Sequence, residues 1–149
     1  MNIKRGSNQY RLKGFTLVEL LVVITILAVL ATIIIPSYRK AVVNATIDDA
    51  KSKLQLIRAA QRMYHLDEYV YTAGDLSSTH DLVANKYLDN LNVDTDPQKN
   101  PYVYSTVVPA NDPPLDDDII GEANRRAGAS TDLLSKLEIT YEGTINETQ

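Results

Sequence analysis

Cysteine and tryptophan are absent from the 149 residues, and phenylalanine occurs once. The lack of cysteine excludes a disulfide framework, a thiolate zinc site and a cysteine nucleophile. Fifteen Lys and Arg stand against nineteen Asp and Glu, a formal charge of -4, so no basic surface for nucleic acid is expected. No Gly-rich phosphate loop, G-x-S-x-G elbow or H-E-x-x-H motif occurs, and we predict that the chain is not an enzyme.

One long apolar run lies near the N-terminus. Residues 15–35 contain a single charge, Glu19, and neither Gly nor Pro. As a helix this run spans about 31 Å, which matches the hydrocarbon core of a membrane. Four basic residues precede it: Lys4, Arg5, Arg11 and Lys13. This positive flank favours a cytoplasmic N-terminus, with the chain after Pro36 outside the inner membrane.

Two simple interpretations of this run fail to explain Glu19. A secretory signal peptide has a shorter apolar region, and no convincing small-residue cleavage site follows this one. An uncleaved signal anchor explains the length and the basic flank. It leaves the carboxylate unexplained, because a charge inside a membrane helix costs up to a few kcal/mol and marks a functional site.

A family resemblance accounts for these details together. The stretch Lys13-Gly14-Phe15-Thr16-Leu17-Val18-Glu19-Leu20 resembles the class III signal of type IV pilins and type II secretion pseudopilins. That family has a basic leader, then Gly, then Phe at the cut, with Glu at the fifth processed position and commonly Pro at the twenty-second. Counted from Phe15, Glu19 is fifth and Pro36 is twenty-second.

The resemblance implies a role for each matching residue. Prepilin peptidase would cut between Gly14 and Phe15, and the new Phe15 amine would be N-methylated. Glu19 would pair with the Phe15 ammonium of a neighbouring subunit during assembly, and Pro36 would kink the helix. The implied partners are further copies in a homopolymeric filament, the peptidase, and an assembly ATPase with its platform protein. The precursor would be a single-pass inner-membrane protein with its head outside, and the product a periplasmic or extracellular filament.

The implied fold class is α+β, a pilin-like fold in which a long N-terminal helix packs on a small antiparallel β-sheet head. We divide the chain into a leader (1–14), an apolar transmembrane or filament-core helix (15–35), an amphipathic continuation (36–66) and a globular head (67–149). Apolar residues at helical spacing predict the face of the continuation that packs on the head. They are Val43, Ile47, Ala50, Leu54, Ile57 and Tyr64, widened by Leu56, Ala60 and Met63.

Within the head we expect about three antiparallel strands. The predicted strands are 102–108 and 137–141, with a turn at 142–143 leading into 144–145. The predicted helical pieces are a short helix capped by Ser78 or Thr79 through about Lys86 with Asp81 in its first turn, and helical turns at Glu122–Arg126 and Thr131–Lys136.

The loop before the first long strand bears on the choice between pilin and pseudopilin. Asp96 to Tyr102 resembles the Asp-Pro-x-x-Asn-Pro-Tyr segment of major pseudopilins, with Gln98-Lys99 in place of the usual Trp-Gly. This replacement weakens the assignment to that branch. The absence of cysteine departs from the many pilins with a disulfide-closed loop. Whether the filament serves adhesion, motility, DNA uptake or secretion stays open, and neighbouring genes would decide it.

Calcium is the one candidate cofactor. Four acidic residues crowd a single loop: Asp112, Asp116, Asp117 and Asp118. Calcium takes six to eight oxygen ligands, and major pseudopilins bind it in a C-terminal loop. The spacing is not that of an EF-hand, however, and an acidic surface loop is the simpler explanation. His65 and His80 are assigned to solvated positions rather than to a zinc pair, and Arg125-Arg126 to a surface rather than to DNA.

Two other functions stay open. The first is an uncleaved single-pass anchor that carries a binding or sensor domain, which predicts an intact N-terminus on the mature protein. The second is an anchored periplasmic enzyme, which needs a deep pocket lined by convergent carboxylates in the head.

Overall fold

The computed structural model describes residues 14–111 and 113–149. Its elements follow in the order α1 (Leu17–Glu68), β1 (Gly74–Asp75), α2 (Asp81–Ala84), β2 (Tyr102–Thr106), β3 (Ile119–Arg125), β4 (Lys136–Thr140) and β5 (Ile145–Thr148). The chain divides into two compact units, one that ends at Lys40 and one from Ala41 to Gln149.

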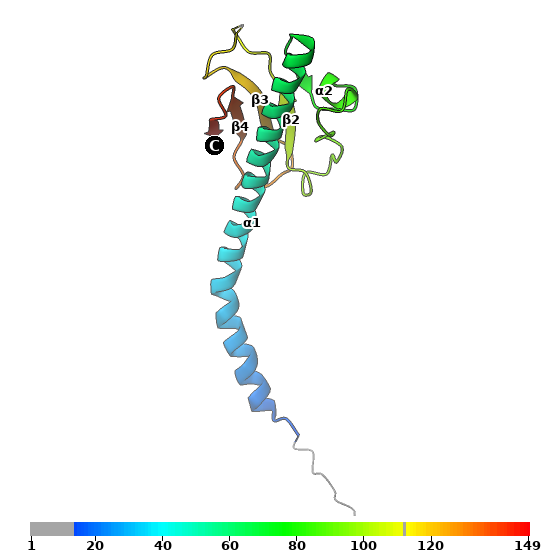
Figure 1. Cartoon of the computed structure of the whole chain (residues 1–149). Coiled ribbons are helices and arrows are strands. Elements are labelled where there is room, and N and C mark those ends of the chain that lie inside the picture. The colour runs from blue at the N-terminus through cyan, green and yellow to red at the C-terminus, as the bar shows by residue number, and fades with distance from the viewer. Residues whose placement is uncertain (1–13, 112) are drawn as a thin grey trace, which may run out of the picture. The chain divides into compact units, whose positions relative to one another are not determined.

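In the first unit, the residues from Leu17 to Lys40 form the beginning of α1 (Figure 1). All its side chains from Leu17 to Lys40 are exposed except Ala31, which is half-buried. The Thr25 and Thr32 hydroxyls donate to the carbonyls of Val22 and Val29 at 2.8 and 2.7 Å. These bonds satisfy the two hydroxyls within the helix itself, so they need no water.

The helix continues through Pro36. Proline has no N–H and leaves one carbonyl of the preceding turn without its helical partner. The Ser37 hydroxyl donates to the carbonyl of Ile33 at 3.3 Å and adds a bond in that turn.

The second unit contains a five-stranded antiparallel sheet in the order β1-β2-β3-β4-β5, so each strand pairs with the next one along the chain. β2 and β3 pair along their length, and an irregularity between Ile119 and Gly121 shifts the register of β3 on β4. The α+β class with an antiparallel sheet is confirmed. The sheet has five strands rather than about three, because β1 and β3 were not predicted, whereas β5 begins where the strand after the 142–143 turn was expected.

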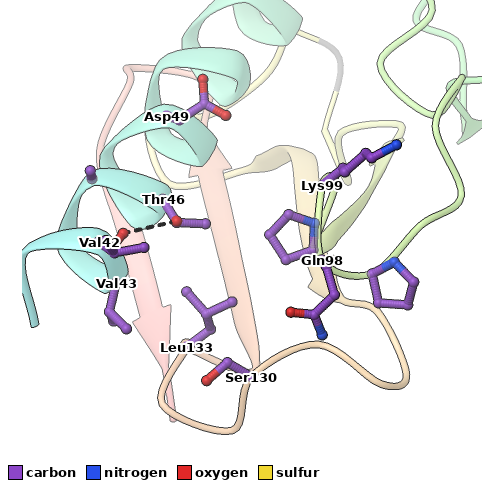
Figure 2. Close-up of a pocket in the computed structure, with 11 residues that line it drawn as sticks. Val42, Val43, Thr46, Asp49, Gln98, Lys99, Ser130 and Leu133 are labelled. Atoms are coloured by element: carbon purple, nitrogen blue, oxygen red, sulfur yellow. Dashed lines mark hydrogen bonds between the residues drawn. The ribbon is translucent and has the colours of Figure 1, made fainter. Parts of the chain in front are cut away.

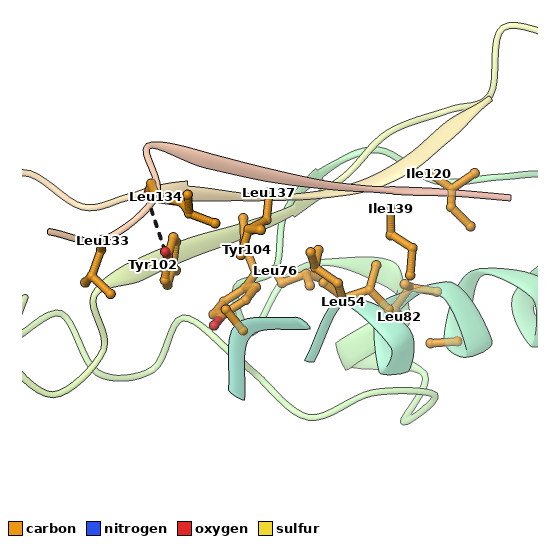
Figure 3. Close-up of a cluster of buried hydrophobic side chains, with 14 of the residues drawn as sticks. Leu54, Leu76, Leu82, Tyr102, Tyr104, Ile120, Leu133, Leu134, Leu137 and Ile139 are labelled. Carbon is orange, nitrogen blue, oxygen red and sulfur yellow. Dashed lines mark hydrogen bonds between the residues drawn. The ribbon is translucent and has the colours of Figure 1, made fainter. Parts of the chain in front are cut away.

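The core lies between the sheet and the second half of α1 (Figure 3). Along β2, Tyr102, Tyr104 and Thr106 are buried, and the residues between them are half-buried, the alternation of a strand with one covered face. The Tyr102 hydroxyl donates to the carbonyl of Leu134 at 3.2 Å. The helix lies so close to β3 that a Cβ at Gly121 would stand 2.9 Å from Ile57 Cγ2.

The predicted packing face of α1 is largely confirmed. Its buried members are Ala50, Leu54, Ile57, Ala60 and Tyr64, and Val43 and Ile47 pack against them. Two predicted members are wrong, because Leu56 and Met63 are 54% and 56% exposed. Both lie on the side of the helix opposite the sheet. Gln61, which apolar periodicity leaves out, is fully buried, and its amide bonds the backbone of Thr72.

Both helical turns predicted late in the head are wrong. Glu122–Arg126 lies mainly in β3, which ends at Arg125 and is paired with β2 on one side and β4 on the other. Thr131–Lys136 is not helical, and its last residue begins β4. Asn124 and Arg125 have little intrinsic preference for strands, but hydrogen bonding to a strand on each side places them in β3.

The borders of the other predicted elements also shift. β2 ends at Thr106 rather than at 108, and β4 runs from Lys136 to Thr140. The short helix is Asp81–Ala84, with Asp81 in its first turn as predicted. Its N-cap is neither Ser78 nor Thr79 but His80, whose Nδ1 accepts a hydrogen bond from the Leu82 N–H at 3.2 Å.

Candidate functional site

The predicted processing site lies directly before α1. Gly14 and Phe15 precede the first helical residue, Leu17, and Phe15 is 72% exposed. A side chain built at Gly14 would meet no heavy atom within 4 Å. Within residues 14–111 and 113–149, therefore, nothing crowds the glycine side of the peptide bond between Gly14 and Phe15.

Glu19 caps the start of α1 together with Thr16. Glu19 Oε2 accepts hydrogen bonds from the Thr16 N–H and hydroxyl, each at 2.9 Å. In return, Thr16 Oγ1 accepts a bond from the Glu19 N–H at 3.1 Å. This is a capping box, which satisfies donors that the first turn of a helix leaves unpaired. The Thr-x-x-Glu spacing is its sequence signal, and it gives Glu19 a role beside the predicted pairing between subunits.

The helix that follows is long and apolar enough to cross a membrane. Its most apolar 18-residue window has a mean hydropathy of 3.0, and none of that window is buried within the protein. Exposed apolar surface on this scale needs cover from lipid or from other chains.

The acidic loop is held by its own hydrogen bonds. Asp118 accepts bonds from the Asn111 side-chain amide at 3.0 and 3.1 Å and from the Leu115 N–H at 2.9 Å. The Leu115 N–H, followed by the Asn111 amide, holds the pKa of the Asp118 carboxyl below its usual value. Asp116 and Asp117 are exposed, and Asp112 lies outside the described residues. Among the residues the structure describes, no three or more acidic or histidine side chains form a group able to hold a metal ion.

Comparison with known proteins decides the family. A family model described as the prokaryotic N-terminal methylation motif matches residues 11–35. Core protein G of the type II secretion system of Pseudomonas aeruginosa is 31% identical over 129 residues, which cover 80% of this chain and 89% of that protein. The chain belongs to the type IV pilin and type II secretion pseudopilin family.

Pilus subunits are also similar to this pilin-like chain. A fimbrial protein of Neisseria meningitidis is 31% identical over 66% of this chain and 57% of its own length. A type IV wide pilus major component of Thermus thermophilus is 41% identical over 41% of this chain and 47% of its own length. No solved structure matches significantly. These relatives are structural subunits, so the prediction that the chain is not an enzyme is confirmed.

The Asp96–Tyr102 loop of this pilin-like chain is organised by Asn100. The Asn100 amide donates to the carbonyls of Leu91 and Asp94 at 2.9 and 3.1 Å. Arg126 donates to the carbonyls of Asn100 and Asp94 at 3.1 and 3.3 Å, and Gln98 donates to the carbonyl of Gly128. These bonds join the loop to the segment that follows β3. Gln98, which replaces the Trp usual at this position in major pseudopilins, makes one of them.

The two histidines lie in different surroundings. The His65 ring stacks on Tyr71 with 4.3 Å between ring centroids. The prediction of a solvated side chain is wrong for His80, which is buried and lies 2.8 Å from the Thr106 hydroxyl through Nε2. Of the two neighbouring arginines, Arg125 donates to the carbonyl of Leu133 at 2.8 Å and Arg126 to the loop described above, so each bonds backbone of the head.

A groove of about 410 Å³ opens between α1 and the loops around Pro97 and Leu133 (Figure 2). It offers one carboxylate, Asp49, which is paired with Lys53 at 2.8 Å, and one ammonium, Lys99. The other lining residues are apolar or neutral. The groove therefore lacks the convergent carboxylates that an anchored enzyme would need.

Proposed function

We propose that this pilin-like chain is inserted as a precursor, cut between Gly14 and Phe15, and polymerised through α1 into a filament. The observation that carries the proposal is the exposed apolar first part of α1, which begins two residues after an uncrowded Gly14–Phe15 bond. Lipid covers this surface before assembly, and the helices of other copies cover it afterwards. An ATPase and a platform protein supply the energy, since no phosphate-binding loop is present in the sequence.

Glu19 serves both states of the chain. Before assembly the capping box satisfies its carboxylate within its own helix. Cleavage creates an ammonium at Phe15, and two opposite unit charges 4 Å apart attract by about 4 kcal/mol at an effective dielectric of 20. Desolvation offsets much of this attraction, so the pair fixes the register of neighbouring subunits more than it adds affinity.

The match to core protein G favours the pseudopilin branch, since it extends through most of the head. On this proposal the filament stays within the secretion apparatus of the cell envelope. Genes for secretion components beside this one support that branch, whereas a gene for a retraction ATPase supports a pilus.

Cleavage is tested by substitution at the glycine. Gly14→Val places a branched side chain where the extended substrate backbone must pass close to the peptidase. We expect the uncut precursor to accumulate, about fourteen residues larger on a gel, while the matched change Gly6→Val within the leader is processed normally. N-terminal sequencing of the mature protein should begin at Phe15. An intact Met1 would instead support an uncleaved anchored domain.

Assembly is tested by separating the charge of Glu19 from its cap. Glu19→Gln keeps an oxygen acceptor for Thr16 and removes the charge, whereas Thr16→Ala removes the cap and keeps the charge. If pairing with a neighbouring ammonium drives assembly, Glu19→Gln is cleaved but yields few filaments in electron micrographs of sheared fractions. Thr16→Ala then still forms filaments. Normal filaments from Glu19→Gln together with few filaments from Thr16→Ala would contradict the pairing mechanism and assign Glu19 to helix capping alone.

A further inference from the structure

A tyrosine and two basic residues follow the apolar run of α1. Tyr38 is 69% exposed, and Arg39 and Lys40 beside it are exposed as well. The helix continues through all three positions, and consecutive helical residues point about 100° apart. The three side chains therefore spread around the helix instead of lining one face. In the part of the chain that the structure describes, neither Arg39 nor Lys40 forms an ion pair.

The two basic residues stand alone in a long uncharged stretch of the sequence. Between Glu19 and Asp48, every residue other than Arg39 and Lys40 is uncharged. Glu19 and Arg39 both lie in α1, twenty residues and thus about 30 Å apart along its axis, which is the thickness of the hydrocarbon core of a bilayer. When Arg39 lies at one boundary of that core, Glu19 lies at the other. The apolar run therefore matches both charges to the polar layers of a membrane.

Basic residues at this end of the run act against the proposed orientation. Lys and Arg close to a transmembrane helix favour the cytoplasmic side, whereas the proposed insertion places Arg39 and Lys40 outside. Cleavage removes the four basic residues of the leader and leaves eleven of the fifteen Lys and Arg against nineteen Asp and Glu. A chain that is acidic overall is repelled by anionic lipid. Arg39 and Lys40 are the charged residues that follow the run most closely, and they attract such lipid.

We propose that Tyr38, Arg39 and Lys40 form a binding site for anionic phospholipid at the outer face of the inner membrane. This proposal rests on the proposed insertion and names the lipid class that the inserted helix selects. The tyrosine ring lies at the level of the headgroups, as aromatic side chains do at membrane boundaries. The Arg39 guanidinium and the Lys40 ammonium bind phosphate oxygens, while their aliphatic stems stay beside the apolar run. Extraction into a filament breaks these contacts, whereas cleavage of the leader leaves them intact.

The absence of tryptophan from the chain allows a direct test. Tyr38→Trp keeps an aromatic ring at the boundary and makes it the single tryptophan of the full-length chain. This chain is reconstituted in vesicles of phosphatidylcholine and phosphatidylglycerol, in which one lipid or the other carries bromine close to its headgroup. Bromine quenches tryptophan fluorescence on contact, so the comparison gives the relative affinity of the two lipids for position 38 and does not report on lipids beside the leader. We expect phosphatidylglycerol to be favoured about fivefold, the effect of one basic residue near an anionic surface.

Two matched double variants separate the site from the overall charge of the chain. Arg39→Gln combined with Lys40→Gln removes both charges at the boundary. Lys86→Gln combined with Lys99→Gln removes two exposed charges of the head and changes the net charge equally. We expect the preference for phosphatidylglycerol to vanish in the first double variant and to persist in the second. An equal affinity for both lipids in the Tyr38→Trp chain, or an equal loss of preference in the two double variants, would overturn the proposal.

The ratio of protein to lipid identifies what covers the basic pair. The preference should persist when each vesicle holds on average less than one chain. A preference that appears only at a high ratio of protein to lipid would mean that other chains cover Arg39 and Lys40, and would reject lipid as the partner. Absence of quenching by either lipid would show that position 38 does not reach a membrane boundary, and would refute the proposed insertion itself. The two failures are therefore distinguishable.

Discussion

His80 is held as a neutral imidazole by bonds at both ring nitrogens. Nδ1 accepts from the Leu82 N–H, so the proton is on Nε2, which donates to the Thr106 hydroxyl. A second proton on Nδ1 would face the Leu82 N–H and abolish the cap of α2. Burial lowers the pKa of the His80 imidazole, and the nearby carboxylates of Asp81 and Asp75 oppose this shift without cancelling it.

This geometry predicts a pH dependence of stability. The unfolded chain binds the proton at the ordinary histidine pKa of about 6.5, and the folded chain binds it only at lower pH. The contribution of His80 is therefore complete above pH 6.5 and is lost as the pH falls below it, by at most about 1.4 kcal/mol per pH unit. Thermal melts of the chain in detergent should show this loss. His80→Asn keeps a capping oxygen without titrating, so an unchanged pH slope in that variant would contradict the assignment.

The residue that follows the C-terminal end of α1 has a strained backbone. Tyr69 follows the helix with φ 61°, its N–H donates to the carbonyl of His65 at 2.9 Å, and its side chain is 80% exposed. This left-handed conformation costs an L-residue about 1–2 kcal/mol and suits glycine. Tyr69→Gly should therefore raise the free energy of unfolding by about 1 kcal/mol. Tyr69→Ala keeps the Cβ and should not, and equal effects of the two changes in melting experiments would reject strain as the cause.

The acidic loop is the second element with a testable property. Because Asp118 already accepts bonds from Asn111 and Leu115, we expect the loop to keep its form without calcium. Asp118→Ala should lower the melting temperature, whereas Asp117→Ala, at an exposed position, should leave it unchanged. Addition of millimolar calcium should not shift the melting temperature of the unchanged chain. A rise would show that a ligand binds the native state, and Asp112 and Asp116 would then be tested as its ligands.

At the scale of the whole molecule, removing the residues before Pro36 should change the solubility of the chain but leave the head folded. A chain that begins at Pro36 lacks the exposed apolar run and keeps the buried face of α1 from Val43 to Tyr64. We expect it to be a soluble monomer with a cooperative thermal transition, because the exposed apolar run is removed and the core of the head is kept. Light scattering and circular dichroism measure both properties. An aggregated or unfolded product would show that the head needs the residues before Pro36.

Local patterns in the sequence were enough for the features that depend on neighbouring residues. The Gly14-Phe15-Glu19 motif, the length of α1 and its buried face all follow from short-range spacing. The outward position of Leu56 and Met63 did not, because an apolar residue fits either a core or an interface and only the sheet decides which. β3 was missed because its strand conformation depends on pairing with β2 on one side and β4 on the other, which the local sequence of 122–126 does not reveal.

The candidate site likewise contains some features that short-range spacing predicts and others that depend on tertiary contacts. The family motif predicts roles for Gly14, Phe15 and Glu19, and the capping box could have been predicted from the Thr16–Glu19 spacing. The cap of α2 could not, because histidine is not a usual N-cap and the hydrogen bond that orients the His80 ring comes from Thr106 on β2, 26 residues away. Backbone acceptors likewise hold Arg58 and Arg126 in place, and the sequence carries no signal for them.

The sequential order of the five strands has a consequence for how the subunit is made. Every strand pairs with its neighbour along the chain, although α2 lies between β1 and β2, so no strand has to insert between two strands that are already paired. Folds dominated by such short-range contacts fold quickly. The sheet can therefore form strand by strand against the second half of α1, which precedes every strand in the sequence. On the proposed function, the head is then already folded when the subunit enters a filament.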